Sequence, residues 1–305
     1  IEDSLKVVRN FTKGKSRMFA FEGGYHGRTL GASSITSSYR YRRRYGHFGE
    51  RAQFIPFPYP FRRPKGMTPE EYADKLVAEF ARLFENEYHG VWDPKVRESE
   101  FAAFYIETIQ GTGGYVIPPK NFYKGLKKVL DDHGILLVVD EIQMGFYRTG
   151  KLWSFEHFDI TPDVVAFGKA LLGTAVGLEV MNMLAEKDYG KQIMESGAYF
   201  LEGLKELQSR HPEIGDVDGL GLALRAEICQ ADGFTPNKEL LDKMVDIGLS
   251  GTLEYQGQQC GLVLDVGGYY KNVITFAPSL EISRAEIDQA MVLLDQLLVR
   301  AKREI

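Results

Sequence analysis

The chain has 305 residues, of which 44% are hydrophobic, so it is long enough to bury a large core and to form two domains. Its formal net charge of -5 argues against bulk affinity for nucleic acid, and its two cysteines, Cys229 and Cys260, imply no disulfide framework. We find no signal peptide and no apolar run long enough to span a membrane, and therefore expect a cytoplasmic protein.

The first residues predict a helix followed by a strand. The spacing of apolar side chains indicates an amphipathic helix over residues 1–11, and residues 18–21 indicate a short strand. Gly23 and Gly24 then predict a turn, because glycine allows the backbone conformations that let Tyr25 approach a ligand.

The segment of residues 39–63 interleaves arginine with aromatic residues. A pattern of this kind is compatible with binding to nucleic acid or to an anionic carrier. Because the whole chain is acidic, we favour a solvated loop or a loop that contacts another subunit.

Strands and helices then alternate. Residues 69–84 predict a helix with Thr68 as its N-cap, residues 102–106 a strand, and residues 122–133 a helix that stops at Gly134. This alternation predicts an α/β fold with a mostly parallel, doubly wound sheet.

Two apolar runs in the middle of the chain end in residues of opposite charge. Residues 135–139 lead into Asp140, and residues 162–168 lead into Lys169. Parallel strands bring their carboxyl ends to one edge of a sheet, where α/β proteins bind ligands. Taken singly, each residue is more typical of a solvated loop or surface. Together they suit pyridoxal phosphate, whose aldehyde bonds to a lysine and whose ring nitrogen needs a carboxylate.

The last part of the chain has the α+β pattern of a smaller second domain. We place the domain limits at 1–190 and 191–305. The predicted elements are a nearly continuous helix over residues 176–210, alternating strand and turn over 214–228, a helix over 239–247, strands over 262–266 and 273–276, and a helix over 284–300 that begins with a capping box of Ser283 and Glu286.

Four motifs in order along the chain carry a resemblance to a known family. The chain resembles the class III (ω-amino acid type) pyridoxal-phosphate aminotransferases of fold type I. The motifs are Tyr25-His26-Gly27-Arg28-Thr29, Glu107-Thr108-Ile109-Gln110-Gly111-Thr112-Gly113-Gly114, Asp140-Glu141-Ile142-Gln143 followed by Gly145 and Arg148-Thr149-Gly150-Lys151, and Pro162-Asp163 followed by Gly168-Lys169.

The resemblance implies roles for the site residues. Lys169 and Asp140 are the expected catalytic residues, and both also bind the cofactor. Tyr25 is expected to stack on the pyridine ring, and Gln143 to hydrogen-bond the ring hydroxyl. The remaining expected cofactor-binding residues are His26 and Glu107, the latter buried near the cofactor. No metal is expected.

Compared with the family, the chain lacks two stretches. It begins inside the helix whose N-terminus binds the cofactor phosphate in the family. After Leu171 the family has a few dozen more residues, with a threonine that reaches the phosphate of the neighbouring subunit. We expect that both stretches are missing because they were disordered around a site without its cofactor.

Substrate preference is inferred from departures from the family pattern. Many members hold an α-carboxylate with an arginine that is gated by a glutamate. Here the gate position is Thr112 and the arginine position is Thr275. Losing both together is coherent, because a buried carboxylate without its cation is costly. Arg28 remains as a residue that could bind a distal carboxylate or form a structural salt bridge.

We therefore expect a ping-pong aminotransferase acting on an amine or ω-amino compound and a carbonyl acceptor. A faint likeness to aminotransferases of prodigiosin-type pyrrole pathways points to an aldehyde or ketone of secondary metabolism. The family forms homodimers with shared active sites, and we expect the same here, with no nucleic-acid or membrane partner. The alternatives are other pyridoxal-phosphate chemistry (racemase, decarboxylase or aminomutase) and a non-catalytic binding protein.

Overall fold

The structure is a computed structural model that describes residues 1–44, 51–168 and 174–305. The chain forms two compact units, each of which is described by itself. Unit 1 comprises Ile1–Thr112, Val116–Gly145 and Trp153–Leu178. Unit 2 comprises Gly113–Tyr115, Phe146–Leu152 and Glu179–Ile305, so two short segments from the middle of the chain belong to the C-terminal unit.

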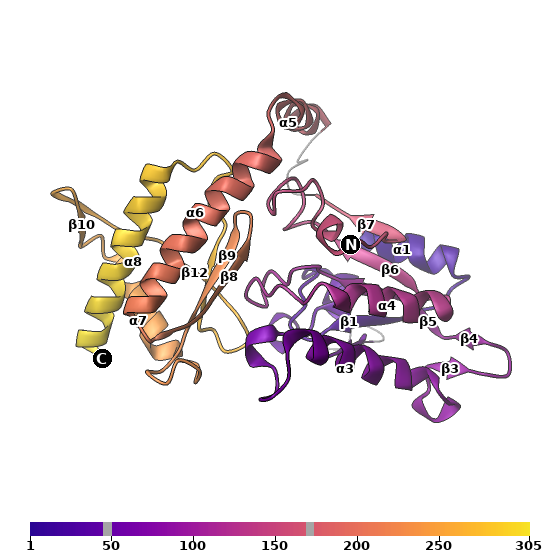
Figure 1. Cartoon of the computed structure of the whole chain (residues 1–305). Coiled ribbons are helices and arrows are strands. Elements are labelled where there is room, and N and C mark those ends of the chain that lie inside the picture. The colour runs from indigo at the N-terminus through magenta and orange to yellow at the C-terminus, as the bar shows by residue number, and fades with distance from the viewer. Residues whose placement is uncertain (45–50, 169–173) are drawn as a thin grey trace. The chain divides into compact units, whose positions relative to one another are not determined.

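Unit 1 is built on a five-stranded sheet with the order β2-β1-β5-β6-β7, in which all neighbouring strands are parallel (Figure 1). The prediction of a mostly parallel α/β sheet is therefore confirmed. The strands are β1 (Arg17–Phe21), β2 (Gln53–Ile55), β5 (Phe101–Ile106), β6 (Leu136–Asp140) and β7 (Val164–Ala166).

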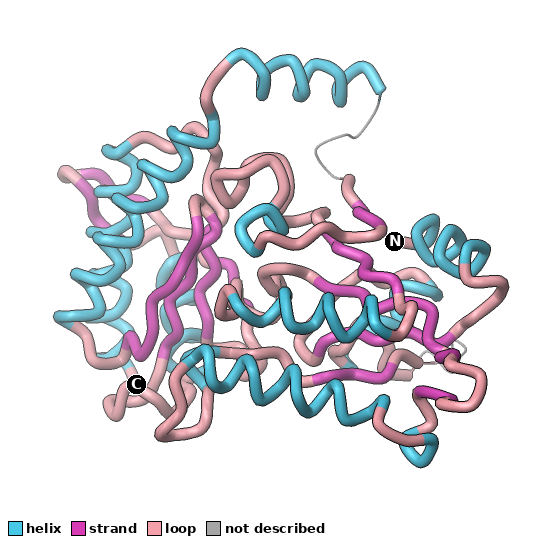
Figure 2. The backbone as a smooth tube through the Cα atoms, turned by 45° about the vertical axis from the view of Figure 1, so that its right-hand side comes forward, coloured by secondary structure: helices cyan, strands magenta, loops and turns pink. Residues whose placement is uncertain are grey.

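Helices cover both faces of this sheet, as the second view also shows (Figure 2). On one face, Leu5 and Val8 of α1 (Glu2–Phe11) pack on alternate strand residues such as Ala20 and Tyr105. The other face carries an aromatic core to which α3 (Pro69–Ala81) and α4 (Asn121–Asp132) contribute. Its rings are Phe19 and Phe21 of β1, Phe104 of β5, Phe80 of α3, Phe84 of the turn after α3, and Phe122 of α4.

Apart from the helices α3 and α4, the remaining elements of unit 1 are short. They are α2 (Leu30–Ile35), β3 (Trp92–Asp93), β4 (Glu98–Ser99), and the 3-10 turns η1 (Tyr39–Tyr41), η2 (Pro60–Arg62), η3 (Arg82–Phe84), η4 (Glu87–His89) and η5 (Ser154–Phe158). Thr68 caps α3 in a reciprocal capping box, and Gly134 after α4 has a φ of 64°, as the stop signal requires.

The basic segment is not only a loop. Residues Gln53–Ile55 form β2, the edge strand of the parallel sheet, because Phe54 and Ile55 pair with Ala20 and Phe21 of β1. The run is three residues long, too short for its alternation to be recognised in the sequence.

Unit 2 packs helices on one face of a four-stranded antiparallel sheet, β12-β13-β9-β8. Helices α6 and α8 lie side by side (Figure 1). Leu224, Ala226 and Ile228 of β9 enter the core on that face. The elements are α5 (Thr174–Glu186), which joins the units, α6 (Tyr189–Arg210), β8 (Ile214–Leu220), β9 (Ala223–Ile228), α7 (Lys238–Leu249), β10 (Leu253–Tyr255), β11 (Gln258–Cys260), β12 (Asp265–Gly267), β13 (Val273–Phe276) and α8 (Arg284–Glu304).

Two predictions in this part of the chain were wrong in detail. The helix predicted over residues 176–210 is broken between Glu186 and Tyr189, because Asp188 starts a new helix by accepting a hydrogen bond from the Lys191 backbone. The strand predicted over 262–266 begins only at Asp265, since the hairpin of β10 and β11 precedes it. The capping box at Ser283 is confirmed.

The predicted domain limits stay a prediction. Internal contacts assign Trp153–Leu178 to unit 1 and Glu179–Ile305 to unit 2, so the changeover lies within α5. The two inserted segments could not be read from the sequence, because composition does not change at either of them.

Gly197 on α6 gives a test of packing in unit 2. A Cβ at Gly197 would lie 2.1 Å from the Gly221 carbonyl oxygen, a backbone atom that cannot move aside easily. Although alanine favours helix by about 1 kcal/mol, we expect Gly197→Ala to lower the free energy of unfolding by about 1–3 kcal/mol. Urea denaturation measures this change.

Gly203 on the same helix is the matched control. A Cβ there would meet only the flexible Met291 side chain, at 3.0 Å. Gly203→Ala should therefore be neutral or stabilising. Equal effects of the two substitutions would contradict the packing argument.

Candidate active site

The predicted site residues of unit 1 follow the carboxyl ends of neighbouring strands. Tyr25 and His26 follow β1, Glu107 follows β5, and Asp140 is the last residue of β6. This edge of a parallel sheet is where α/β proteins bind ligands. Lys169, the expected catalytic lysine after β7, lies outside the described residues.

Asp140 is held in a buried, polar position. One carboxylate oxygen, Oδ2, lies 3.0 Å from Nδ1 of His26, and Oδ1 accepts a hydrogen bond from the Ile142 backbone at 3.1 Å. The His26 and Asp140 side chains are 1% and 6% exposed. A buried carboxylate with spare lone pairs beside an imidazole can hold a positively charged ring nitrogen, which is what pyridoxal phosphate requires.

The second ring nitrogen of His26 has an unusual environment. Nε2 is buried and has no hydrogen-bond partner among the described residues. The backbone of His26 is fixed, because its N–H donates to Thr36 Oγ1 at 3.0 Å. In the neutral tautomer in which Nδ1 donates its proton to Asp140, Nε2 is an acceptor.

Glu107 ties two loops of the site together. Its Oε2 accepts from the Tyr25 backbone N–H at 2.8 Å, and its Oε1 accepts from the Gly111 N–H at 3.1 Å. Burial raises the pKa of the Glu107 carboxyl to about 7; His26 and the two backbone donors oppose this shift, and the charge of Asp140 adds to it. The position of Tyr25 thus depends on a carboxyl group that titrates near neutral pH.

Gly111 leaves room for Gln143. A Cβ at Gly111 would lie 1.9 Å from Gln143 Oε1 and 3.2 Å from Glu107 Oε1. The glycine-rich motif and the Asp-Glu-Ile-Gln motif therefore meet at this point, which brings Gln143 and Glu107 to the same part of the site.

The Tyr25 ring is partly exposed and contacts the ring of Tyr41. It meets the Tyr41 ring edge-on, with 4.9 Å between centroids. Arg28 hydrogen-bonds the Tyr25 side chain, which raises the pKa of its guanidinium, and its Cζ lies 4.8 Å from the Tyr41 ring centroid. Arg28 has no carboxylate partner among the described residues. The structure therefore gives no salt bridge for the structural role that was one of the two alternatives for Arg28.

Sequence reasoning assigned no role to Glu141, which shapes the loop after β6. Its carboxylate accepts hydrogen bonds from the Ser154 and Phe155 backbone N–H groups at 3.0 Å and from Ser154 Oγ at 2.7 Å. Burial raises the pKa of Glu141. Only its place directly after Asp140 could have drawn attention to it, since Ser154 is distant in sequence.

The two predicted substrate threonines belong to different units. Thr112 is half-buried and is the last residue of the first segment of unit 1. Thr275, in unit 2, is buried and donates from Oγ1 to Asp265 at 2.6 Å. Its neighbour across the strand ladder is Arg225, a fully buried arginine that sequence reasoning missed and that pairs with Asp216 and Glu227.

Within the described ranges there is no cluster of three or more side chains that could hold a metal ion. None of the helices described is long and apolar enough to cross a membrane.

The raised pKa of Glu107 predicts a pH-dependent stability. Its ordinary pKa is 4.5 and its folded value about 7, so the folded state binds the proton more tightly. The stabilisation is complete below pH 4.5 and is lost as the pH rises through 7, by at most about 3 kcal/mol. Glu107→Gln has no titrating carboxyl at this position and should lack the pH-dependent stabilisation. The difference in unfolding free energy between wild type and variant should therefore become smaller as the pH rises from 4.5 through 7.

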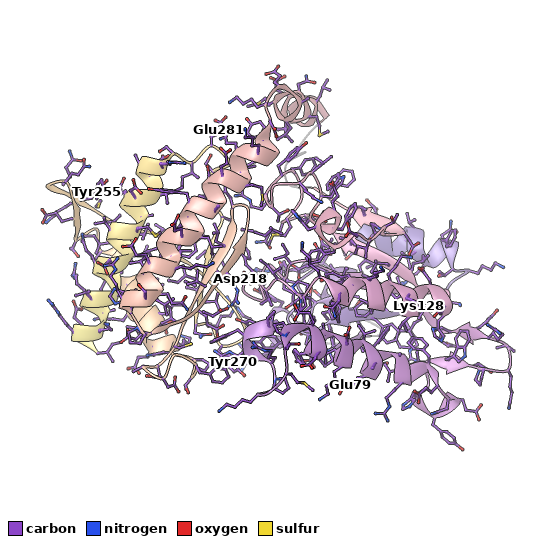
Figure 3. The ribbon with its side chains drawn as sticks, in the orientation of Figure 1. Glu79, Lys128, Asp218, Tyr255, Tyr270 and Glu281 are labelled. Carbon is purple, nitrogen blue, oxygen red and sulfur yellow. The ribbon has the colours of Figure 1, made fainter. Side chains whose placement is uncertain are left out.

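Urea denaturation at several pH values from 4.5 to 8 measures this difference. Glu79→Gln is the control, because Glu79 is exposed on α3 (Figure 3). A constant difference between wild type and Glu107→Gln at every pH would refute the assignment.

The family described as "Aminotransferase class-III" matches residues 1–174 and 171–298. The chain is 32% identical to the alanine/serine racemase of Pyrococcus horikoshii, over 98% of this chain and 67% of the racemase. It is 28% identical to a probable 4-aminobutyrate aminotransferase of Bacillus subtilis, over 97% and 71% of the two chains.

Solved structures agree in fold. An (S)-enantioselective omega-transaminase from Thermomicrobium roseum superposes with a TM-score of 0.79 at 26% identity, over 99% of this chain and 72% of that one.

Proposed function

The chain belongs to the class-III aminotransferase family of pyridoxal-phosphate-dependent enzymes, fold type I, and from this premise we propose that it transfers an amino group between an amine or ω-amino compound and a carbonyl acceptor by a ping-pong mechanism. The observation that carries the proposal is the buried Asp140–His26 pair at the carboxyl edge of the sheet, next to Tyr25 and Gln143. These residues have the chemistry that the cofactor needs.

Pyridoxal phosphate, when bound, would supply an electron-accepting ring that stabilises negative charge at the substrate carbon. Asp140 would keep a proton on the ring nitrogen, and His26 fixes the Asp140 carboxylate through Nδ1. Tyr25, held by Glu107, would support the ring face, and Gln143 the ring hydroxyl. Lys169 would bind the cofactor and then, with its free Nζ, accept a proton from the substrate carbon and return it.

The preferred substrate follows from Thr112 and Thr275. Neither side chain can pair with an α-carboxylate as a cation would, and Thr275 already donates to Asp265. We propose that an ω-amine, a diamine or a long aldehyde or ketone is used more readily than a plain α-amino acid. An acceptor of secondary metabolism, as in prodigiosin-type pyrrole pathways, fits this preference.

Further properties are part of the proposal. The enzyme would work as a homodimer with shared active sites, in the cytoplasm, with small molecules as its partners. Compared with its relatives, the sequence would lack a stretch after Leu171: the two family matches meet at residues 171–174, and the alignment with the racemase has 331 positions although the chain has 305 residues.

Product analysis with an isotope-labelled amine tests the proposal. The enzyme is incubated with pyridoxal phosphate, a nitrogen-labelled amine from a panel of monoamines, diamines and ω-amino acids, and an aldehyde or 2-oxo acid. Label in a different product molecule requires transamination. Fast turnover of glutamate with 2-oxoglutarate, above that of every ω-amine, would refute the substrate preference.

Racemisation is the second candidate, because the 32%-identical relative is an alanine/serine racemase. It would use the same residues, with the proton returned to the opposite face of the substrate carbon. Exchange of the α-hydrogen of L-alanine with deuterated water, with formation of D-alanine and no carbonyl acceptor present, would favour this function. Absence of both exchange and D-alanine would exclude it.

A further inference from the structure

Unit 1 carries a strongly basic stretch that the proposed chemistry does not use. Between Gly23 and Pro69 the sequence has nine lysine and arginine residues and a single acid, Glu50, whereas the whole chain has a net charge of -5. We call six of these residues the arginine platform: Arg28, Arg40, Arg42, Arg43, Arg44 and Arg51. Arg28, Arg40, Arg43, Arg44 and Arg51 are exposed, and the structure gives none of these five an ion pair with a described carboxylate.

Aromatic rings restrict four of the six platform residues, Arg28, Arg40, Arg42 and Arg51. Tyr41 lies under two guanidinium groups, with its centroid 4.8 Å from Arg28 Cζ and 5.6 Å from Arg40 Cζ. Phe54 of β2 does the same for two others; Arg51 Cζ is 4.7 Å and Arg42 Cζ 5.8 Å from its centroid. Stacking restricts these long side chains, so less conformational entropy is lost when they bind an anion.

Two residues of the platform, Arg28 and Arg40, lie next to Tyr25, the residue proposed to stack on the cofactor. Arg28 hydrogen-bonds Tyr25, and the Tyr41 ring that carries Arg28 and Arg40 also meets the Tyr25 ring at 4.9 Å. An anion bound on the platform would thus belong to a molecule that reaches the Tyr25 side of the site.

We propose that the arginine platform binds the phosphate group of a phosphorylated carbonyl substrate. The inference rests on the proposed transaminase function and names the class of its acceptor. A guanidinium group donates two parallel hydrogen bonds to two oxygens of a phosphate. Several guanidinium groups together offer more donors than the two oxygens of one carboxylate can accept, which favours phosphate as the ligand. Nucleic acid is disfavoured, because Tyr41 and Phe54 already stack on guanidinium groups and are not free to stack on bases.

The test compares two acceptors that differ only by phosphate, glyceraldehyde 3-phosphate and glyceraldehyde, with the best amine of the panel. We expect wild-type kcat/KM to favour the phosphorylated acceptor by about tenfold or more at low salt, and this preference to shrink as ionic strength rises. In Arg40→Gln/Arg43→Gln/Arg44→Gln the preference should fall to about twofold or less.

The control variant removes the same charge elsewhere on unit 1. Lys75→Gln/Lys124→Gln/Lys128→Gln changes three exposed lysines of α3 and α4; Lys128 is labelled in Figure 3. It should keep the wild-type preference. An equal loss in both triple variants would overturn the proposal, because net charge alone would then explain it.

A binding measurement does not depend on turnover. Phosphorus NMR titration with inorganic phosphate should give about tenfold weaker binding to the platform variant than to wild type or control. If no amine is turned over, the transaminase function fails while phosphate binding still reports on the platform. Three results in the platform variant would each overturn the proposal. The first is a phosphate affinity equal to that of the wild type. The others are an unchanged acceptor preference together with either weaker binding of pyridoxal phosphate or a changed oligomeric state.

Discussion

Replacing Lys169 by alanine should abolish covalent attachment of the cofactor and lower turnover on the order of 10⁴-fold or more, because one amine both anchors the cofactor and moves the proton. Borohydride reduction followed by mass spectrometry of the peptide that contains residue 169 measures attachment. Steady-state kinetics with the best amine of the panel measures turnover.

Lys128→Ala is the control for this substitution, because Lys128 is an exposed lysine whose ion pair is with Asp132, one turn along α4. It should attach the cofactor at residue 169 as the wild type does. Attachment to another lysine, or full turnover by Lys169→Ala, would show that the catalytic lysine was assigned wrongly.

Asp140→Asn should lower kcat about 10²- to 10³-fold, since the amide cannot stabilise a positive charge on the ring nitrogen where negative charge develops in the transition state. The exchange keeps size and shape, so the fold of β6 should survive. His26, whose Nδ1 loses its charged partner, should bind the new side chain less tightly.

Two measurements separate a catalytic effect from a structural one. Urea denaturation should show that Asp140→Asn is folded at assay temperature, and Asp163→Asn, which alters the carboxylate bonded to the Leu137 backbone, should lose stability without a comparable loss of kcat. A kcat for Asp140→Asn within tenfold of wild type would contradict the assigned role.

The parts of the fold that the sequence predicts best are those in which local pattern and burial agree. β5 and β6 are apolar runs because both faces of a parallel sheet are covered, so they read as strands without alternation. Caps such as Thr68 and Ser283 are local signals as well, and they mark helix starts accurately. The placing of Asp140 at the carboxyl end of β6 follows from the same run.

Contacts between residues distant in sequence could not be derived from spacing. His26 contacts the Asp140 carboxylate through Nδ1, and the Glu107 carboxylate accepts a hydrogen bond from the Tyr25 backbone. Both contacts arise because β1, β5 and β6 are adjacent in the sheet. Sequence patterns give strands but not their order, so these pairings became visible only in the structure. The break at Asp188 was missed because a residue that caps one helix looks like an ordinary polar position of a longer one.

The chain does not complete its units in the order of synthesis. Residues 146–152 belong to unit 2, where Arg148 donates through Nη1 to the Pro278 carbonyl at 2.6 Å and the Leu222 backbone N–H donates to the Arg148 carbonyl at 3.0 Å. On a ribosome adding 5–20 residues per second, the partners of Arg148 follow it after roughly 4–25 s. During synthesis, the segment of residues 146–152 therefore leaves the ribosome before its partners in unit 2 exist, and its hydrogen bonds to Leu222 and Pro278 form only after most of the chain has been made.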